Sequence, residues 1–224
     1  AWAAEGVING AVRADRQTKG RGRAGRSWIS EGGNFYASWL TKPNLEMAEW
    51  PGFSLAASLA VCKTIEAQSS TQLTLTLKWP NDLLLDQQKL AGILLETVPE
   101  TRQLIIGIGI NLAHAPKDNQ LTKGQSWSAT ALADYGVVSS AASLFKPLGQ
   151  ALDQMMGLWA TDPDELLQQW QKYGPTYDEK LTLHDGTSRF QGRYQGLDRD
   201  GALRIIHEPS NEMRILHMAD IIQS

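Results

Sequence analysis

The segment KWPNDLLLDQQKLAGILLE, residues 78–96, decides how the chain around it folds. Leucine and threonine alternate just before it, which is the pattern of a half-buried strand, and Pro80 ends that strand. The residues after Lys89 are apolar up to Glu96, which predicts a second, largely buried strand. We expect strands over residues 71–79, 89–98 and 103–112.

Two further strands and three helices are predicted outward from this segment. The strands are expected over residues 11–14 and Phe35–Thr41, and the helices over residues 50–68, 140–160 and 162–173. The first of these helices is apolar on most faces, so it should be buried, and Pro147 should kink the second. Residues 1–5 are expected to end another helix, which Gly6 stops.

The pattern changes after Tyr177, where apolar residues recur at every second position in short runs separated by turns. Regularly spaced short strands of this kind are typical of a small antiparallel barrel. We therefore expect an α+β fold in two domains. The first is a mixed sheet with packed helices in residues 1–176, and the second is a small β-barrel in residues 177–224.

The composition excludes several classes of protein. A net charge of −3 over 224 residues gives no global electrostatic reason to bind nucleic acid or an anionic membrane. The single cysteine, Cys62, rules out an internal disulfide and a cysteine-based zinc cluster, and it fits a reducing cytoplasm. No apolar run approaches the ~20 residues of a membrane span. The chain opens without methionine, so we expect a processed protein or a fragment of a longer one.

The stretch GRGRAGR, from Gly20 to Arg26, alternates glycine with arginine and is followed by Trp28. Glycines let the backbone approach a ligand and offer its N–H groups to anions. Arginine guanidinium groups match carboxylate and phosphate groups. The stretch predicts a mobile loop that folds over an anion, while a solvated flexible loop and an RNA-binding arginine–glycine segment remain the alternatives.

Three polar side chains follow the first strand of the opening segment. Lys78 is delivered by the strand, and Pro80 forces a turn that presents Asn81 and Asp82 together. Carboxylate and amide oxygens suit Mg²⁺, and an ammonium group suits phosphate. An Asn-Asp turn that caps its own backbone is the alternative.

Lys89 begins the next predicted strand, and two glycines lie within the predicted strand that follows it. Lys89 could place one positive charge in a low-dielectric pocket, where it would stabilise an oxyanion or a phosphate, or it could protect a strand edge from aggregation. In the run GIGIN, Gly107 and Gly109 leave space for a ligand and Asn111 can hydrogen-bond it, although strand glycines also mark bulges.

Taken together, GRGRAGR, KWPNDL, KLAGILLE and GIGIN resemble, in order and spacing, the catalytic core of biotin protein ligases. The resemblance implies that ATP activates biotin to biotinyl-5'-AMP, with Mg²⁺, and that biotin is then transferred to a lysine of a biotin carboxyl carrier protein, an acetyl-CoA carboxylase subunit. It also implies an SH3-like barrel for residues 177–224 and allows a homodimer. A lipoate or octanoate ligase and a non-enzymatic ligand-sensing module are the competing hypotheses.

The resemblance also assigns roles to individual residues. Biotin contacts are implied at Gln17, Gly20, Arg21, Gly22, Arg23, Lys89, Gly92 and Gly107. ATP contacts are implied at Arg26, Lys78, Asn81, Asp82, Asn111 and Trp127. Among these, Arg23 and Lys89 are the implied catalytic residues, Asp82 is the implied metal ligand, and Trp28 is expected to pack near the closed loop.

The sequence departs from the family pattern at two places. Ala24 stands where the family often has arginine. The family's Ser-Thr-Asn segment, which lines the biotin pocket, has no counterpart before the first strand, and we expect residues 2–6 to end the helix that should follow it. We also expect the family's optional N-terminal DNA-binding domain to be absent.

Overall fold

The computed structural model describes residues 9–117 and 127–222. The helix end expected over residues 1–5, and most of the loop expected over residues 113–125, lie outside the described residues. The large sheet consists of β1 (Gly10–Ala14), β2 (Phe35–Thr41), β3 (Leu75–Lys78), β4 (Asp82–Leu85), β5 (Gln88–Val98) and β6 (Gln103–Ile110). Its strand order is β1-β2-β6-β5-β4-β3.

Every pair of neighbouring strands in this sheet is antiparallel. The α+β class is confirmed, but the pairing differs from the mixed sheet that we expected. Parallel pairing occurs in the described residues at an isolated bridge between Lys89 and Ala129. The strands from β3 to β6 follow one another through short connections. Short connections favour antiparallel neighbours, because parallel neighbours need long crossovers.

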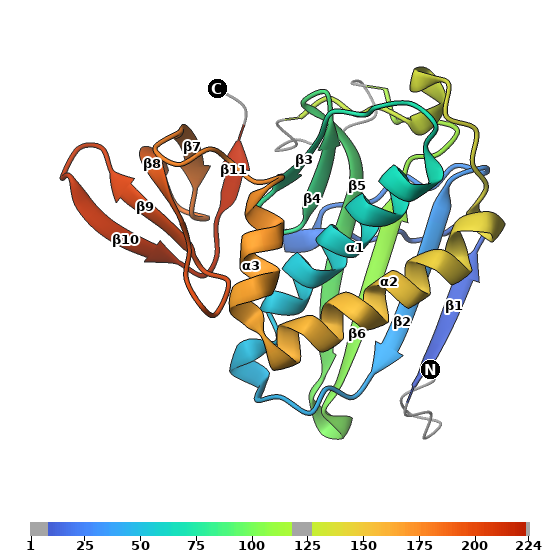
Figure 1. Cartoon of the computed structure of the whole chain (residues 1–224), viewed down its shortest axis with the longest axis horizontal. Helices are drawn as coiled ribbons and strands as arrows, with labels where there is room; N and C mark the ends of the chain where they lie inside the picture. The colour runs from blue at the N-terminus through green and yellow to red at the C-terminus, as the bar shows by residue number, and fades with distance from the viewer. Residues whose placement is uncertain (1–8, 118–126, 223–224) are drawn as a thin grey trace.

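Three helices, α1 (Gly52–Gln68), α2 (Ala141–Thr161) and α3 (Pro163–Gln171), cover one face of the sheet (Figure 1). Helix α1 is buried on most sides, as its apolar sequence predicts. Helix α2 runs through Pro147 and has Ser140 as its N-cap, and Asp162 caps α3, whose first residue is proline. With the helices on one face, the other face of the sheet is left for the segment between β1 and β2.

A second sheet of five strands follows α3, in the order β10-β9-β8-β7-β11. Its strands are β7 (Lys180–His184), β8 (Arg189–Leu197), β9 (Leu203–His207), β10 (Glu212–Leu216) and β11 (Asp220–Ile222). All pairs are antiparallel, as expected for a small C-terminal barrel. A domain boundary near Tyr177 remains our proposal.

The two sheets are joined by buried hydrogen bonds. The indole Nε1 of Trp79 donates to the carbonyl of Gly201 at 2.9 Å, and Lys78 Nζ donates to the carbonyl of Ile221 at 3.4 Å. These bonds start from β3 and the residue after it, so they hold the C-terminal sheet beside that end of the large sheet (Figure 1).

Two strands were not predicted from the sequence. We interpreted Asn81 and Asp82 as a turn, but the turn is so tight that β4 begins at Asp82 itself. The last strand, β11, is three residues long and pairs with β7. The strand expected over residues 71–79 is shorter and spans Leu75–Lys78.

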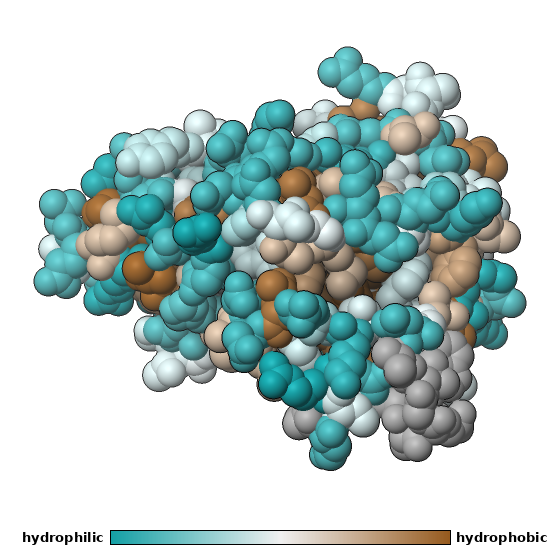
Figure 2. Space-filling view, turned by 60° about the horizontal axis from the view of Figure 1, so that its bottom comes forward, coloured by the Kyte–Doolittle hydropathy of each residue, from teal (hydrophilic) through white to brown (hydrophobic). Residues whose placement is uncertain are grey.

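None of the helices in residues 9–117 and 127–222 is long and apolar enough to cross a membrane. Polar side chains cover most of the face in Figure 2, and apolar side chains occur in separate patches, one of them on the C-terminal sheet at the left of the view.

Candidate active site

A pocket of about 200 Å³ lies on the helix-free face of the large sheet. Its floor is built by β2, β4, β5 and β6. Its wall includes Arg21, Gly22, Arg23 and Arg26 of the segment Gly20–Arg26, which we call the Gly-Arg loop. The pocket brings together ten of the predicted site residues: Gln17, Arg21, Gly22, Arg23, Arg26, Asn81, Asp82, Lys89, Gly92 and Gly107. Residues from four separate motifs therefore meet at one place.

The floor of the pocket is a row of paired residues without bulky side chains. Asp82 of β4 pairs with Gly92 of β5, and Gly92 pairs with Gly109 of β6. The indole of Trp28 lies over both glycines, since a Cβ at Gly92 would come within 2.9 Å of that ring and a Cβ at Gly109 within 2.7 Å. The glycines thus serve to admit a flat group against the sheet, and Gly107 leaves further space beside it.

A buried carboxylate with two lysines forms the charged centre of the site. Lys78 Nζ lies 2.9 Å from Asp82 Oδ2, and Lys89 Nζ lies 2.7 Å from Asp82 Oδ1. Lys89 also lies over the ring of Trp28, with Nζ 5.6 Å from the ring centroid. Two cations therefore share one anion, which leaves an excess of positive charge at the pocket.

Burial and charge shift the pKa values of this centre in opposite ways. Burial alone would raise the pKa of the Asp82 carboxyl, but the adjacent Lys78 and Lys89 outweigh burial, so its pKa is lowered. Burial lowers the pKa of Lys89, and Asp82 counteracts only part of that effect. The carboxylate thus stays ionised, and Lys89 carries a charge that is poorly solvated and available to an incoming anion.

The Gly-Arg loop is closed by its own backbone. The Trp28 amide donates to the carbonyl of Gly20 at 2.9 Å, and the Gly22 amide donates to the carbonyl of Arg26 at 2.7 Å. Between them Ala24 adopts a left-handed conformation, with φ of 54°, and Gly25 follows with φ of 73°. A larger side chain in the pocket wall is excluded at Gly20, where a Cβ would overlap the Trp28 carbonyl. Gly20 itself therefore shapes the loop without lining the pocket.

Contacts from two other segments, Asn81 and β11, hold Arg23 and Arg26 of the loop. Arg23 Nη1 donates to Asn81 Oδ1 at 3.3 Å and lies 3.5 Å from Asp220 Oδ1. Arg26 Nη2 donates to Asp220 Oδ2 at 2.9 Å. Burial lowers the pKa of Arg23, although an arginine remains charged at any ordinary pH. The β11 carboxylate Asp220 was not predicted, and it places the C-terminal sheet in direct contact with the loop.

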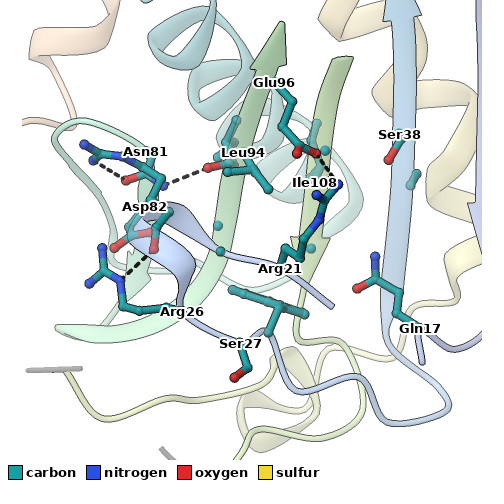
Figure 3. A pocket seen from close by; sticks show the side chains of 18 of the residues that line it. Gln17, Arg21, Arg26, Ser27, Ser38, Asn81, Asp82, Leu94, Glu96 and Ile108 are labelled. Carbon is teal, nitrogen blue, oxygen red and sulfur yellow. Dashed lines mark hydrogen bonds and ion pairs between the residues drawn. The ribbon is translucent and has the colours of Figure 1, made fainter. Parts of the chain in front are cut away.

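A separate ion pair joins the loop to β5. Arg21 Nη2 lies 2.9 Å from Glu96 Oε2 (Figure 3). Since Arg21 is largely exposed, this contact adds little to stability. It does place a guanidinium group across the pocket mouth.

The remaining predicted residues lie outside this pocket. Lys78 and Trp127 line a second hollow of about 440 Å³, between β3 and the C-terminal sheet. The indole Nε1 of Trp127 donates to the carbonyl of Ile221 at 3.2 Å. Asn111 is buried, and its amide donates to the carbonyl of Thr130 at 3.0 Å, so in this arrangement it supports the neighbouring loop. The roles of all three toward ATP stay predictions.

The charged centre does not fit a metal ion held by the protein. Both Asp82 oxygens contact lysine ammonium groups, and Asn81 Oδ1 accepts from Arg23. Within the described ranges, no three acidic, histidine or cysteine side chains come together as metal ligands. Asp82 as a Mg²⁺ ligand stays a prediction.

This arrangement is suited to bringing two anions together. Four cationic side chains, Lys78, Lys89, Arg23 and Arg26, face two carboxylates, Asp82 and Asp220. The remaining positive charge lies in a partly desolvated pocket, where it interacts strongly with a carboxylate or phosphate. The glycine floor accepts an uncharged group beside these cations.

Comparisons with known proteins agree with this geometry. A family model described as the biotin/lipoate A/B protein ligase family matches residues 9–111. The biotin–[acetyl-CoA-carboxylase] ligase of Paracoccus denitrificans is 29% identical over 212 residues, which cover 91% of this chain and 86% of that protein. The bifunctional ligase/repressor BirA of Bacillus subtilis is 31% identical, over 98% of this chain and 66% of its own length.

Solved structures give the same relationship at the level of the fold. The biotin protein ligase from Aquifex aeolicus in complex with biotin and ATP superposes with a TM-score of 0.79 at 26% identity, over 96% of this chain and 89% of that one. The biotin protein ligase from Leishmania major in complex with biotinyl-5-AMP superposes with a TM-score of 0.64 at 25% identity, over 96% of this chain and 91% of that one.

Proposed function

Since the chain belongs to the biotin/lipoate A/B protein ligase family, we propose that it activates biotin with ATP and transfers it to a protein lysine. The observation that carries the proposal is the buried Lys78–Asp82–Lys89 centre, which faces the Gly-Arg loop across a floor of glycines. Relatives named as biotin–[acetyl-CoA-carboxylase] ligases give the acceptor class, a carrier protein of a biotin-dependent carboxylase.

In the first step, a carboxylate oxygen of biotin attacks the α-phosphorus of ATP, and the bond from that phosphorus to pyrophosphate breaks. Both reactants are anions, so the barrier includes their mutual repulsion. Lys89 and the loop arginines Arg23 and Arg26 supply the opposing charge, and they are held in place before the reactants arrive.

In the second step, the acceptor lysine attacks the acyl carbon of biotinyl-5'-AMP, an amide bond forms, and AMP leaves. The adenylate is a mixed anhydride that water would hydrolyse. A Gly-Arg loop closed over the pocket and a Trp28 indole against its floor exclude water from that bond.

Asp82 acts on this chemistry through Lys89. Its carboxylate, with a lowered pKa, holds the ammonium group at 2.7 Å and offsets part of the effect of burial on the pKa of Lys89. Lys78 contacts the other carboxylate oxygen and shares the single negative charge, so Asp82 does not fully neutralise Lys89. We therefore propose Asp82 and Lys78 as positioning residues.

The proposal extends to location and assembly. A cytoplasmic site is supported by the need for ATP and by the single buried cysteine, Cys62. A homodimer would use β1, the outer strand of the large sheet as far as the described residues define it. Nucleic acid and membrane partners are not part of the proposal, because the net charge is −3.

The family description also covers lipoate ligases, which are the main competing assignment. A non-enzymatic ligand sensor is the other. An assay of transfer separates all three. The chain, ATP and a carboxylase carrier domain are incubated with biotin, lipoate or octanoate, and the carrier is weighed by mass spectrometry. The proposal expects addition of one biotinyl group. Addition of lipoyl or octanoyl groups alone, or binding of biotin without transfer, would reject it.

A further inference from the structure

Strand β11 forms the edge of the C-terminal sheet that lies nearest to the large sheet (Figure 1). Its backbone is fixed there by the carbonyl of Ile221, which accepts from Lys78 Nζ at 3.4 Å and from Trp127 Nε1 at 3.2 Å. Asp220 of the same strand pairs with His184 of β7 in the register of the sheet. None of these contacts uses the Asp220 carboxylate, so the position of β11 does not depend on that group.

The Asp220 carboxylate bridges two arginines of the Gly-Arg loop. Its Oδ1 lies 3.5 Å from Arg23 Nη1, and its Oδ2 lies 2.9 Å from Arg26 Nη2. The three side chains are between 26% and 28% exposed, so water screens these pairs only in part. Two neighbouring guanidinium groups repel one another. A carboxylate that gives one oxygen to each of them therefore sets how far apart they lie.

Each arginine keeps donors that a ligand can use. Arg26 donates from Nη2 to Asp220 and from Nε to the carbonyl of Arg23, at 3.1 Å. Arg23 uses Nη1 for both Asp220 and Asn81. Within residues 9–117 and 127–222, Arg26 Nη1 and Arg23 Nη2 have no partner. Because a guanidinium group is a rigid planar fork, contacts at one edge also orient the N–H groups that remain.

The carboxylate holds the arginines from outside the cavity. Arg23 and Arg26 line the pocket, whereas Asp220 is not among the lining residues. Figure 3 shows Arg26 beside Asp82, at the charged centre of the site. An inhibitory carboxylate would occupy the cavity in place of a substrate anion. The arrangement favours a supporting role instead.

We propose that Asp220 is a positioning residue for adenylate formation, through which the C-terminal sheet sets the spacing and orientation of Arg23 and Arg26. The inference rests on the proposed function, because these arginines offset the repulsion between the biotin carboxylate and ATP. Such stabilisation requires donors that are fixed before the reaction, and a small displacement of them costs a large factor in rate. The negative charge of Asp220 does not itself attract ATP. Its loss should lower kcat without raising the KM for ATP.

The test is biotin-dependent exchange of labelled pyrophosphate into ATP, with kcat and the KM for ATP determined separately. The variants are Asp220→Ala and Asp220→Asn. Asp178→Asn is the matched control, because Asp178 pairs with Arg193 of β8 at 2.8 Å and neither residue lines the pocket. Circular dichroism and the thermal midpoint confirm that each variant is folded. We expect both Asp220 variants to lower kcat roughly 10- to 100-fold, and Asp178→Asn to keep the wild-type rate.

Formate separates positioning from packing. Asp220→Ala leaves a space in which formate, a carboxylate of one carbon, can lie between the two guanidinium groups. Replacing chloride by formate at constant ionic strength should therefore raise the kcat of Asp220→Ala severalfold. The wild type and Asp220→Asn should not respond, because their own side chains fill that space.

A folded Asp220→Ala variant with the wild-type kcat would overturn the inference. A raised KM for ATP at unchanged kcat, or a lowered kcat that formate does not restore, would do the same, since packing of β11 would then be responsible. An equal loss in Asp178→Asn would count against it too. Asp220→Asn, which keeps the shape of the side chain, decides the comparison of kcat if alanine prevents folding. If the wild-type chain shows no biotin-dependent exchange, the proposed function fails before the variants are compared.

Discussion

Replacement of Lys89 by alanine should abolish most adenylate formation while leaving the chain folded. The Lys89 side chain is 19% exposed, its Nζ lies 2.7 Å from Asp82 Oδ1, and it lines the pocket beside the glycine floor. The other lysine of the charged centre, Lys78, lines the second hollow instead. Alanine removes the charge and leaves the strand intact.

Two magnitudes follow from the contacts. Removing one preorganised charge-stabilising group costs roughly 10²–10³ in rate. Breaking a buried ion pair costs ~3–5 kcal/mol when the partner is left alone, but Asp82 keeps Lys78 at 2.9 Å. We therefore expect a smaller loss of stability, about 2 kcal/mol, or ~4–8 °C in the thermal midpoint of a chain of this size.

The assay is pyrophosphate release in the presence of biotin and ATP, with thermal unfolding measured on the same samples. Lys180→Ala is the matched control, because Lys180 is an exposed lysine on β7 that pairs with Glu208 at 3.0 Å. Its rate should equal that of the wild type. Release at the wild-type rate by a folded Lys89→Ala variant would refute the assignment of Lys89.

Three further perturbations address the loop, the floor and the charged centre. Asp220→Asn should increase tryptic cleavage of the Gly-Arg loop roughly fivefold, since about 1 kcal/mol of ion pairing is lost; unchanged cleavage would show that the contact does not hold the loop. Gly109→Ala should raise the KM for biotin roughly tenfold, because its Cβ would come within 2.7 Å of the Trp28 indole, and an unaltered KM would contradict that packing. The lowered pKa of Asp82 means that its stabilisation is present above the unfolded value of ~3.9 and is lost as pH falls through the folded pKa. Urea midpoints of the wild type should therefore fall below about pH 4 more steeply than those of Asp82→Asn, and parallel curves would reject the shift.

Much of the large sheet and of its floor could be predicted from the sequence. Strand glycines such as Gly92 and Gly107 imply that something approaches the backbone, and the pocket is where that occurs. Lys89 was interpreted as a residue at the mouth of a strand, and Asp82 as part of a turn with Asn81. Their direct contact was not predicted, because it depends on the pairing of β4 with β5, and β4 itself was taken for a turn.

The contacts that were missed join residues far apart in the sequence. Asp220 meets Arg26 across 194 positions, and it lies on a three-residue strand that has no clear period. Ser38 lines the pocket because of the register between β2 and β6. A pattern of alternating residues does not specify that register. Short motifs indicated which chemistry to expect, while tertiary pairing determined which side chains share the pocket.

The most direct test of the proposed function is biotin-dependent exchange of labelled pyrophosphate into ATP by the purified chain. The exchange requires reversible formation of biotinyl-5'-AMP and no acceptor protein, so it isolates the first step at the site of Lys89 and the Gly-Arg loop. We expect exchange with biotin and little with lipoate or octanoate. Exchange that is absent with biotin, or that is faster with lipoate, would contradict the assignment of this chain as a biotin ligase.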